Sequence, residues 1–142
     1  MKTVYIDGVF DLFHRGHLES LLKAKNVLND ISNTFLVVGI VSDADCESYK
    51  RKPIIKEEDR VEIIKSLKVV DNIIFPCPLI VTNEFLEKNN IDLVVHGFIN
   101  ENDRNKQKEF FEKIREIGKF KEIDYYSETS TTKIIKNIKD NY

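Results

Sequence analysis

Two of the chain's three histidines, His14 and His17, stand three positions apart in the stretch GVFDLFHRGHLESLLKAK, with Gly16 between them. This stretch follows a short apolar run and passes into a helical pattern, so the pair falls at the start of a helix. The free backbone N–H groups and the positive dipole at such a start favour bound phosphate. Gly8 and Gly16 would let an anion approach the backbone. We therefore expect a phosphate site at which the imidazoles donate hydrogen bonds.

Imidazoles at this position suit phosphoryl or nucleotidyl transfer. These reactions depend mainly on positioning and on stabilising charge at the non-bridging oxygens, so no serine or cysteine nucleophile is required. A histidine close to a helix start can also be a cap or a half-buried surface residue. A further alternative is a three-histidine metal site of His14, His17 and His96, as in some zinc hydrolases.

Composition excludes several classes of function. The chain of 142 residues has 24 acidic and 22 basic side chains and a formal charge of -2, which provides no bulk attraction to nucleic acid or to a membrane surface. No signal-peptide core and no apolar run of membrane-spanning length is present, so a cytoplasmic protein without an integral membrane segment is predicted. Cys46 and Cys77 lack CxxC spacing and are predicted to be free thiols.

Short β-branched runs alternate with segments of helical period over the whole chain, which we interpret as one domain, residues 1–142. Strands are predicted at 3–7, 34–41, 69–75, 91–97 and 120–126. Helices are predicted at 17–29, 57–67, 83–90, 106–118 and 130–140, and the polar stretch 42–56 is predicted to be a surface loop. Residues expected to face the core are Leu18, Leu21, Leu22, Ala24, Leu28, Phe110 and Phe111, with further apolar positions at 134, 135 and 138.

This βαβ alternation predicts an α/β fold, a Rossmann-like doubly wound sheet of five parallel strands in the order 3-2-1-4-5. Ligands bind such sheets at the carboxyl ends of the strands, near the switch between the first and fourth strands. Three polar clusters fall at that edge: His14 with His17, His96 with Gly97, and the segment 130–132. We expect them to form one site.

The stretch GVFDLFHRGH resembles the GxFDxxHxGH signature of the cytidylyltransferase branch of the HxGH nucleotidyltransferases. The resemblance continues through SDAD at 42–45, YKRKP at 49–53, EEDR at 57–60, VD at 70–71, IDLVVHG at 91–97 and STTKII at 130–135. It implies a usually homodimeric enzyme of phospholipid headgroup synthesis. Such an enzyme transfers CMP from CTP to phosphoethanolamine, phosphocholine or glycerol 3-phosphate, giving a CDP-alcohol and pyrophosphate.

The resemblance also implies roles for individual residues. His14 and His17 donate to the CTP phosphates in the pentacoordinate transition state, and Lys50 and Arg60 neutralise phosphate charge. Asp11 orders the loop or the metal shell. The remaining implied nucleotide-binding residues are Gly8, Val9, Phe10, Gly16, His96, Gly97, Ser130, Thr131 and Thr132. Mg²⁺ would arrive with CTP rather than in a cage of protein ligands.

Each cluster keeps a structural alternative. A basic stretch such as 50–52 is commonly a solvated surface, the segment 130–132 can be a helix cap, and Asp11 can be a loop-stabilising acceptor.

Two positions depart from the family pattern. Phe98 and Ile99 stand where acidic residues are expected, and Tyr125 stands in place of an arginine whose charge a phenol cannot replace. We hypothesise that Arg104 supplies this charge. Further hypothetical contacts, to the base, are Asn100 and Asn102. The alternative function is a degenerate family member that binds a nucleotide or a protein partner without catalysis.

Overall fold

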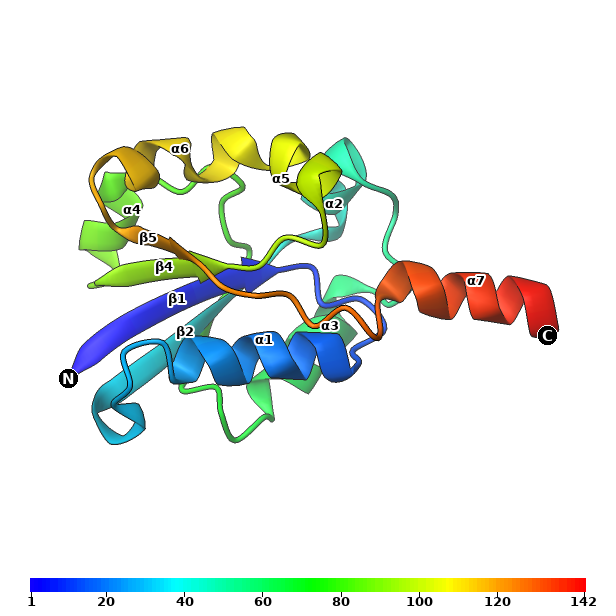
Figure 1. Ribbon diagram of the computed structural model, residues 1–142, viewed down its shortest axis with the longest axis horizontal. Coiled ribbons are helices and arrows are strands. Elements are labelled where there is room, and N and C mark those ends of the chain that lie inside the picture. The colour runs from blue at the N-terminus through cyan, green and yellow to red at the C-terminus, as the bar shows by residue number, and fades with distance from the viewer.

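The computed structural model describes residues 1–142 and contains one five-stranded parallel sheet in the order β3-β2-β1-β4-β5, as predicted (Figure 1). The strands are β1 (Lys2–Gly8), β2 (Thr34–Ile40), β3 (Asn72–Ile74), β4 (Leu93–His96) and β5 (Phe120–Glu122). The helices are α1 (Arg15–Lys25), α2 (Asp43–Tyr49), α3 (Glu57–Lys65), α4 (Asn83–Lys88), α5 (Glu101–Lys106), α6 (Lys108–Glu116) and α7 (Thr131–Asn141), with a 3₁₀ turn η1 (Ile31–Asn33).

Helices cover both faces of the sheet, which explains why the central strands are apolar throughout. On one face Val4 and Ile6 of β1 pack with Leu21 of α1 and Ile64 of α3. On the other face Tyr5 belongs to a second cluster, whose helical members are Leu86 of α4 and Phe111 and Ile114 of α6. Alternation along β1 therefore sends successive side chains into two separate cores.

Several predicted elements differ from the structure. The stretch predicted as a loop contains α2, because the Ser42 side chain accepts a hydrogen bond from the Asp45 N–H and so caps a helix with an acidic first turn. The predicted helix 106–118 is α6, and a further helix that was not predicted, α5, precedes it and meets it at Gln107. Helix α1 ends at Lys25, and two leucines predicted to face the core, Leu22 and Leu28, are 44% and 40% exposed.

The fifth strand ends early, and the chain then crosses the carboxyl edge of the sheet to reach α7. This helix projects from the body (Figure 1), and none of its residues is buried. Its predicted apolar positions are consequently not core, and Ile138 is 50% exposed. No helix in the structure combines the length and the apolar character needed to cross a membrane.

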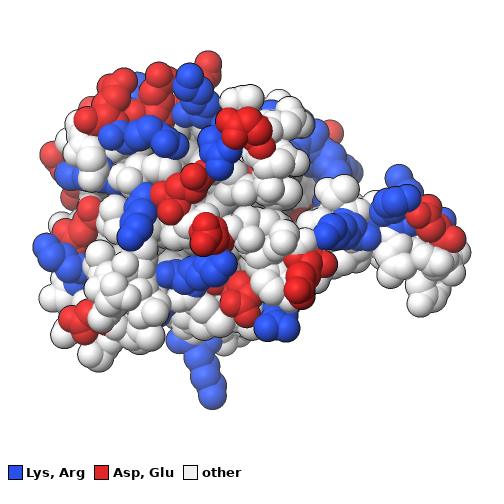
Figure 2. Space-filling view, in the orientation of Figure 1, with Lys and Arg blue, Asp and Glu red and all other residues white.

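Charged side chains are mixed over the surface. Lys and Arg alternate with Asp and Glu on the face shown in Figure 2 rather than gathering into a patch of one sign, in keeping with the small net charge.

Candidate active site

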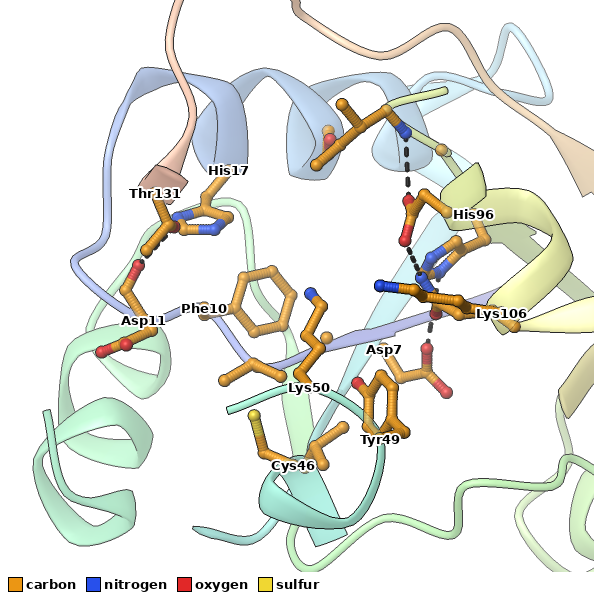
Figure 3. A pocket seen from close by; sticks show the side chains of 18 of the residues that line it. Asp7, Phe10, Asp11, His17, Cys46, Tyr49, Lys50, His96, Lys106 and Thr131 are labelled. Carbon is orange, nitrogen blue, oxygen red and sulfur yellow. Dashed lines mark hydrogen bonds and ion pairs between the residues drawn. The ribbon is translucent and has the colours of Figure 1, made fainter. Parts of the chain in front are cut away.

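A pocket of about 420 Å³ opens at the carboxyl edge of the sheet (Figure 3). Segments that follow β1, β2, β4 and β5 form its walls, as the rule for doubly wound sheets predicts. The predicted site residues that line it are Gly8, Val9, Phe10, Asp11, His17, Lys50, His96, Gly97, Thr131 and Thr132. Those that do not are His14, Gly16, Arg60 and Ser130.

The two histidines cap helix α1 reciprocally. His14 is the N-cap residue, and its Nδ1 accepts a hydrogen bond from the Gly16 N–H at 2.9 Å. His17, at the third helical position, accepts from the His14 N–H through its own Nδ1 at 3.2 Å. The arrangement is a capping box with imidazoles in place of the usual hydroxyl and carboxylate.

This cap fixes the tautomers. An Nδ1 that accepts a hydrogen bond carries no proton, so each neutral ring bears its hydrogen on Nε2. Burial lowers the pKa of His14, and burial together with the charges of His14 and Lys50 lowers the pKa of His17 to about 3. Both rings are therefore neutral donors at physiological pH. His17 lines the pocket, whereas the His14 ring stacks behind it with the ring centroids 3.9 Å apart.

The position of the His14 ring requires a residue without a side chain at position 16. A Cβ at this position would lie 2.7 Å from Cε1 of His14 and 3.0 Å from the Thr129 carbonyl oxygen, closer than packed atoms approach. Gly16 was predicted to admit a ligand to the backbone, but the space beside it is taken by the His14 ring and by the segment that precedes α7. Its role is to let these groups approach the helix start.

The loop before α1 has an uncommon backbone that Asp11 holds in place. Phe10 and Leu12 adopt φ angles of 57° and 50°, in the left-handed region that bulky residues rarely enter. The buried Asp11 carboxylate accepts hydrogen bonds from the Ile54 and Ile55 N–H groups at 2.8 and 2.9 Å. Burial alone would raise the pKa of Asp11, but these N–H groups and Arg51 lower it overall. Asp11 thus anchors the basic segment after α2 to the pocket.

Arg60 is buried under the pocket rather than exposed to it. Its side chain is fully inaccessible, and its guanidinium donates to the carbonyl oxygens of Val9, Val41 and Ile55 at 2.8–2.9 Å. A fourth hydrogen bond, of 2.6 Å, goes to Asp43. The prediction that Arg60 contacts phosphate is therefore wrong for this structure, because its donors are already engaged. Arg60 instead joins the ends of β1 and β2 to α3.

The segment after β5 completes the histidine side of the pocket. Ser130 caps α7 by accepting from the Lys133 N–H, which is the structural alternative for this residue. Thr131 Oγ1 donates a hydrogen bond to the Asp11 carbonyl oxygen at 3.0 Å. Thr131 Oγ1 also lies 3.4 Å from Nε2 of His14. His14 therefore reaches the pocket wall through Thr131.

A sequence model of the family described as cytidylyltransferase-like matches residues 5–137. The chain belongs to this family. Choline-phosphate cytidylyltransferase 2 of Arabidopsis thaliana is 37% identical over 140 residues, 98% of this chain and 45% of the relative. Ethanolamine-phosphate cytidylyltransferase of Dictyostelium discoideum is 34% identical over 132 residues, 93% of this chain and 35% of the relative. The chain thus spans less than half the length of these curated relatives.

The fold is shared with a solved structure of similar size. The lipopolysaccharide core biosynthesis protein from Thermoplasma volcanium GSS1 matches with a TM-score of 0.68 and 26% sequence identity, over 91% of this chain and 99% of that one. The cytidylyltransferase-like family and the predicted Rossmann-like architecture therefore agree.

The departures from the family pattern have defined places in this cytidylyltransferase-like chain. Phe98 is buried against His96 and Phe111, so it belongs to the core. Tyr125 lines the pocket, where burial and Asp103 raise its pKa and keep it neutral. Arg104 does not replace the missing arginine charge, because it lies outside the pocket lining and pairs with Glu101 and Glu122.

The two asparagines hypothesised to contact a base also lie outside the lining. Asn100 caps α5 by accepting from the Asp103 N–H, and Asn102 is exposed.

Several pocket residues were not predicted from the sequence. Asp7 is the penultimate residue of the apolar strand β1 and is only 8% exposed, and its carboxylate lies near the Tyr5 hydroxyl and 3.5 Å from Nδ1 of His96. An acidic residue at the carboxyl end of a buried strand is a signal that sequence reasoning could have used. The other lining residues that were missed are Ile6, Ser20, Val41, Cys46, Tyr49, Arg51, Leu79, Ile99, Asp103, Lys106, Gln107 and Phe110.

The three-histidine metal alternative does not fit. No group of three or more His, Cys, Asp or Glu side chains is arranged to hold a metal ion. The Nδ1 atoms of His14 and His17 are engaged in the helix cap, and His96 lies beside Asp7 on the other side of the pocket (Figure 3).

Proposed function

We propose that this chain transfers CMP from CTP to the phosphate of a small alcohol phosphate, giving a CDP-alcohol and pyrophosphate. The observation that carries this proposal is the reciprocal histidine cap, which provides a pre-oriented neutral Nε2–H donor on His17 at the wall of the pocket. The family and the names of its relatives supply the nucleotide and the class of acceptor.

In this reaction an oxygen of the acceptor phosphate attacks the α-phosphorus of CTP. A new P–O bond forms, the bond from the α-phosphorus to the bridging oxygen breaks, and the electron pair leaves with pyrophosphate. His17 donates to a non-bridging oxygen as charge gathers there, while Thr131 and Thr132 hold the triphosphate beside the start of α7. Lys50, which has no ion-pair partner, lies over the centre of the pocket and neutralises phosphate charge (Figure 3).

The pocket best fits an acceptor alcohol phosphate that carries an amine or ammonium group. Asp7 points into the pocket on the side away from His17, and no lysine or arginine pairs with its nearly buried carboxylate. A cationic head group would compensate that charge, whereas the hydroxyl groups of glycerol 3-phosphate would leave it uncompensated. We therefore favour phosphoethanolamine or phosphocholine.

Mg²⁺ fits as a companion of the nucleotide rather than as a resident ion. The pocket has no cluster of three protein ligands, and Mg²⁺ prefers phosphate oxygens and water. Bound with CTP, it would be held by phosphate oxygens and water and would neutralise charge on the triphosphate. We also propose a homodimer, on the resemblance to the family.

The test is pyrophosphate release with Mg²⁺ and CTP against phosphoethanolamine, phosphocholine and glycerol 3-phosphate, with ATP as the nucleotide control. We expect turnover with CTP and an amine-bearing acceptor. CTP binding without turnover on any acceptor would instead support the degenerate member, for which the neutral Tyr125 is the first candidate cause.

A further inference from the structure

The charged side chains of the pocket are unequally compensated. Arg51 is paired with Asp11 at 3.0 Å, and Asp103 accepts hydrogen bonds from the Ile99 N–H and from Nε2 of Gln107. The other two basic residues of the lining, Lys50 and Lys106, have no hydrogen-bond or ion-pair partner. Two uncompensated ammonium groups thus face one pocket.

These lysines come from different walls. Lys50 directly follows α2 as its C-cap residue and lies near His17, whose pKa it helps to lower. Lys106 is the last residue of α5 and lies with Asp7 and His96 on the other side (Figure 3). The pocket therefore has His17 and Thr131 at one side, Lys50 near the middle, and Lys106 at the side where Asp7 lies.

Local structure fixes the start of the helix that carries Lys106. Asn100 accepts from the Asp103 N–H at 2.9 Å, and Asp103 accepts in return from the Ile99 N–H at 3.1 Å. Asp103 also accepts from Gln107 at 2.7 Å, one turn further along. Residues 103, 106 and 107 share one helical face, so these hydrogen bonds turn Lys106 toward the pocket.

We propose that Lys106 binds the phosphate of the acceptor. This inference rests on the proposed function, in which two anions must approach each other. The triphosphate occupies the side of His17 and Thr131, so the attacking phosphate enters from the side of Asp7 and lies between Lys50 and Lys106. An ammonium group there offsets the repulsion between the two anions, and the alcohol portion then extends toward Asp7.

The experiment compares Lys106→Gln and Lys106→Arg with the wild type. Lys108→Gln is the matched control, because Lys108 is an exposed lysine two positions away that does not line the pocket. We expect Lys106→Gln to raise the KM for the best acceptor about tenfold, as the loss of one exposed charge-assisted hydrogen bond does. The kcat and the KM for CTP should stay within about twofold of the wild type, and Lys106→Arg should restore most of the acceptor affinity.

A raised KM for CTP in Lys106→Gln, or no change in either KM, would overturn the proposal.

Should the wild type transfer CMP to no acceptor, the proposed function fails, and calorimetry then decides the role of Lys106. Phosphoethanolamine is titrated into protein saturated with a non-hydrolysable CTP analogue. Weaker binding to Lys106→Gln but not to Lys108→Gln supports the site, whereas equal binding, or no binding to the wild type, refutes it.

Discussion

Substitutions of His17 can separate its two roles, because its nitrogens do different work. Nδ1 caps the helix by accepting from the His14 N–H, and Nε2 is free to donate into the pocket. Asparagine places its amide oxygen near the position of Nδ1 and has no atom at Nε2. Glutamine places its amide nitrogen near Nε2 and leaves the Nδ1 position without an acceptor. Alanine removes both.

The expected magnitudes follow from these contacts. A capping hydrogen bond contributes about 1 kcal/mol, so His17→Asn should be about 1 kcal/mol more stable than His17→Ala. All three variants lose the packing of the ring against Phe10 and Phe13, whose centroids lie 5.5 and 5.6 Å away. Removing a donor to developing charge costs about 10²–10³ in kcat, which His17→Asn and His17→Ala should show alike. His17→Gln should keep more activity than either.

Urea unfolding gives the stabilities, and pyrophosphate release with CTP and phosphoethanolamine gives the activities. The capping argument is refuted if His17→Asn and His17→Ala unfold at the same urea concentration. The donor argument is refuted if His17→Asn retains more than about a tenth of the wild-type kcat, well above the loss expected for one donor.

Three further predictions test other parts of the site. Arg60→Met should destabilise the ligand-free protein by about 3–5 kcal/mol in urea unfolding, because it strands three carbonyl oxygens under the pocket and removes the partner of the partly exposed Asp43. A variant as stable as the wild type but weak in CTP binding would show that Arg60 contacts phosphate. Asp7→Asn should raise the KM for phosphoethanolamine about tenfold or more and leave that for glycerol 3-phosphate unchanged; equal effects on both acceptors would exclude an ammonium site. Unfolding lets His17 take up a proton below its ordinary pKa of about 6.5, while its folded pKa is about 3. The free energy of unfolding should therefore decrease as the pH falls from about 6.5 to about 3, by up to about 1.4 kcal/mol per pH unit from this residue. The decrease should be shallower in His17→Asn, and parallel curves for the two proteins would show that His17 is not held neutral.

Local sequence signals predicted the architecture because the fold is built from local periodicity. The apolar runs of β1 and β2 and the helices between strands leave few ways to connect a parallel sheet, so the strand order was also predicted. Boundaries were less well predicted. Helix α2 begins at the Ser42 cap and α5 at the Asn100 cap, contacts that hydrophobic periodicity does not register.

The polar side chains were harder to assign, because residue type does not reveal which partner a charge will have. Arg60 and Lys106 are both basic residues near the start or the end of a helix, yet one is enclosed by backbone carbonyls and the other faces the pocket. Arg104, two positions from Lys106, is paired with two glutamates.

The sequence by itself determined the strand order, the edge at which the site forms, and the three segments that meet there, because the rule for doubly wound sheets depends on connectivity alone. Tertiary structure decided which nitrogen of each histidine remains free, which cations are uncompensated, and where the Asp7 carboxylate points. These properties depend on contacts between residues far apart in the chain, such as Asp11 with Ile54 and Arg60 with Val9, and no spacing along the sequence encodes them.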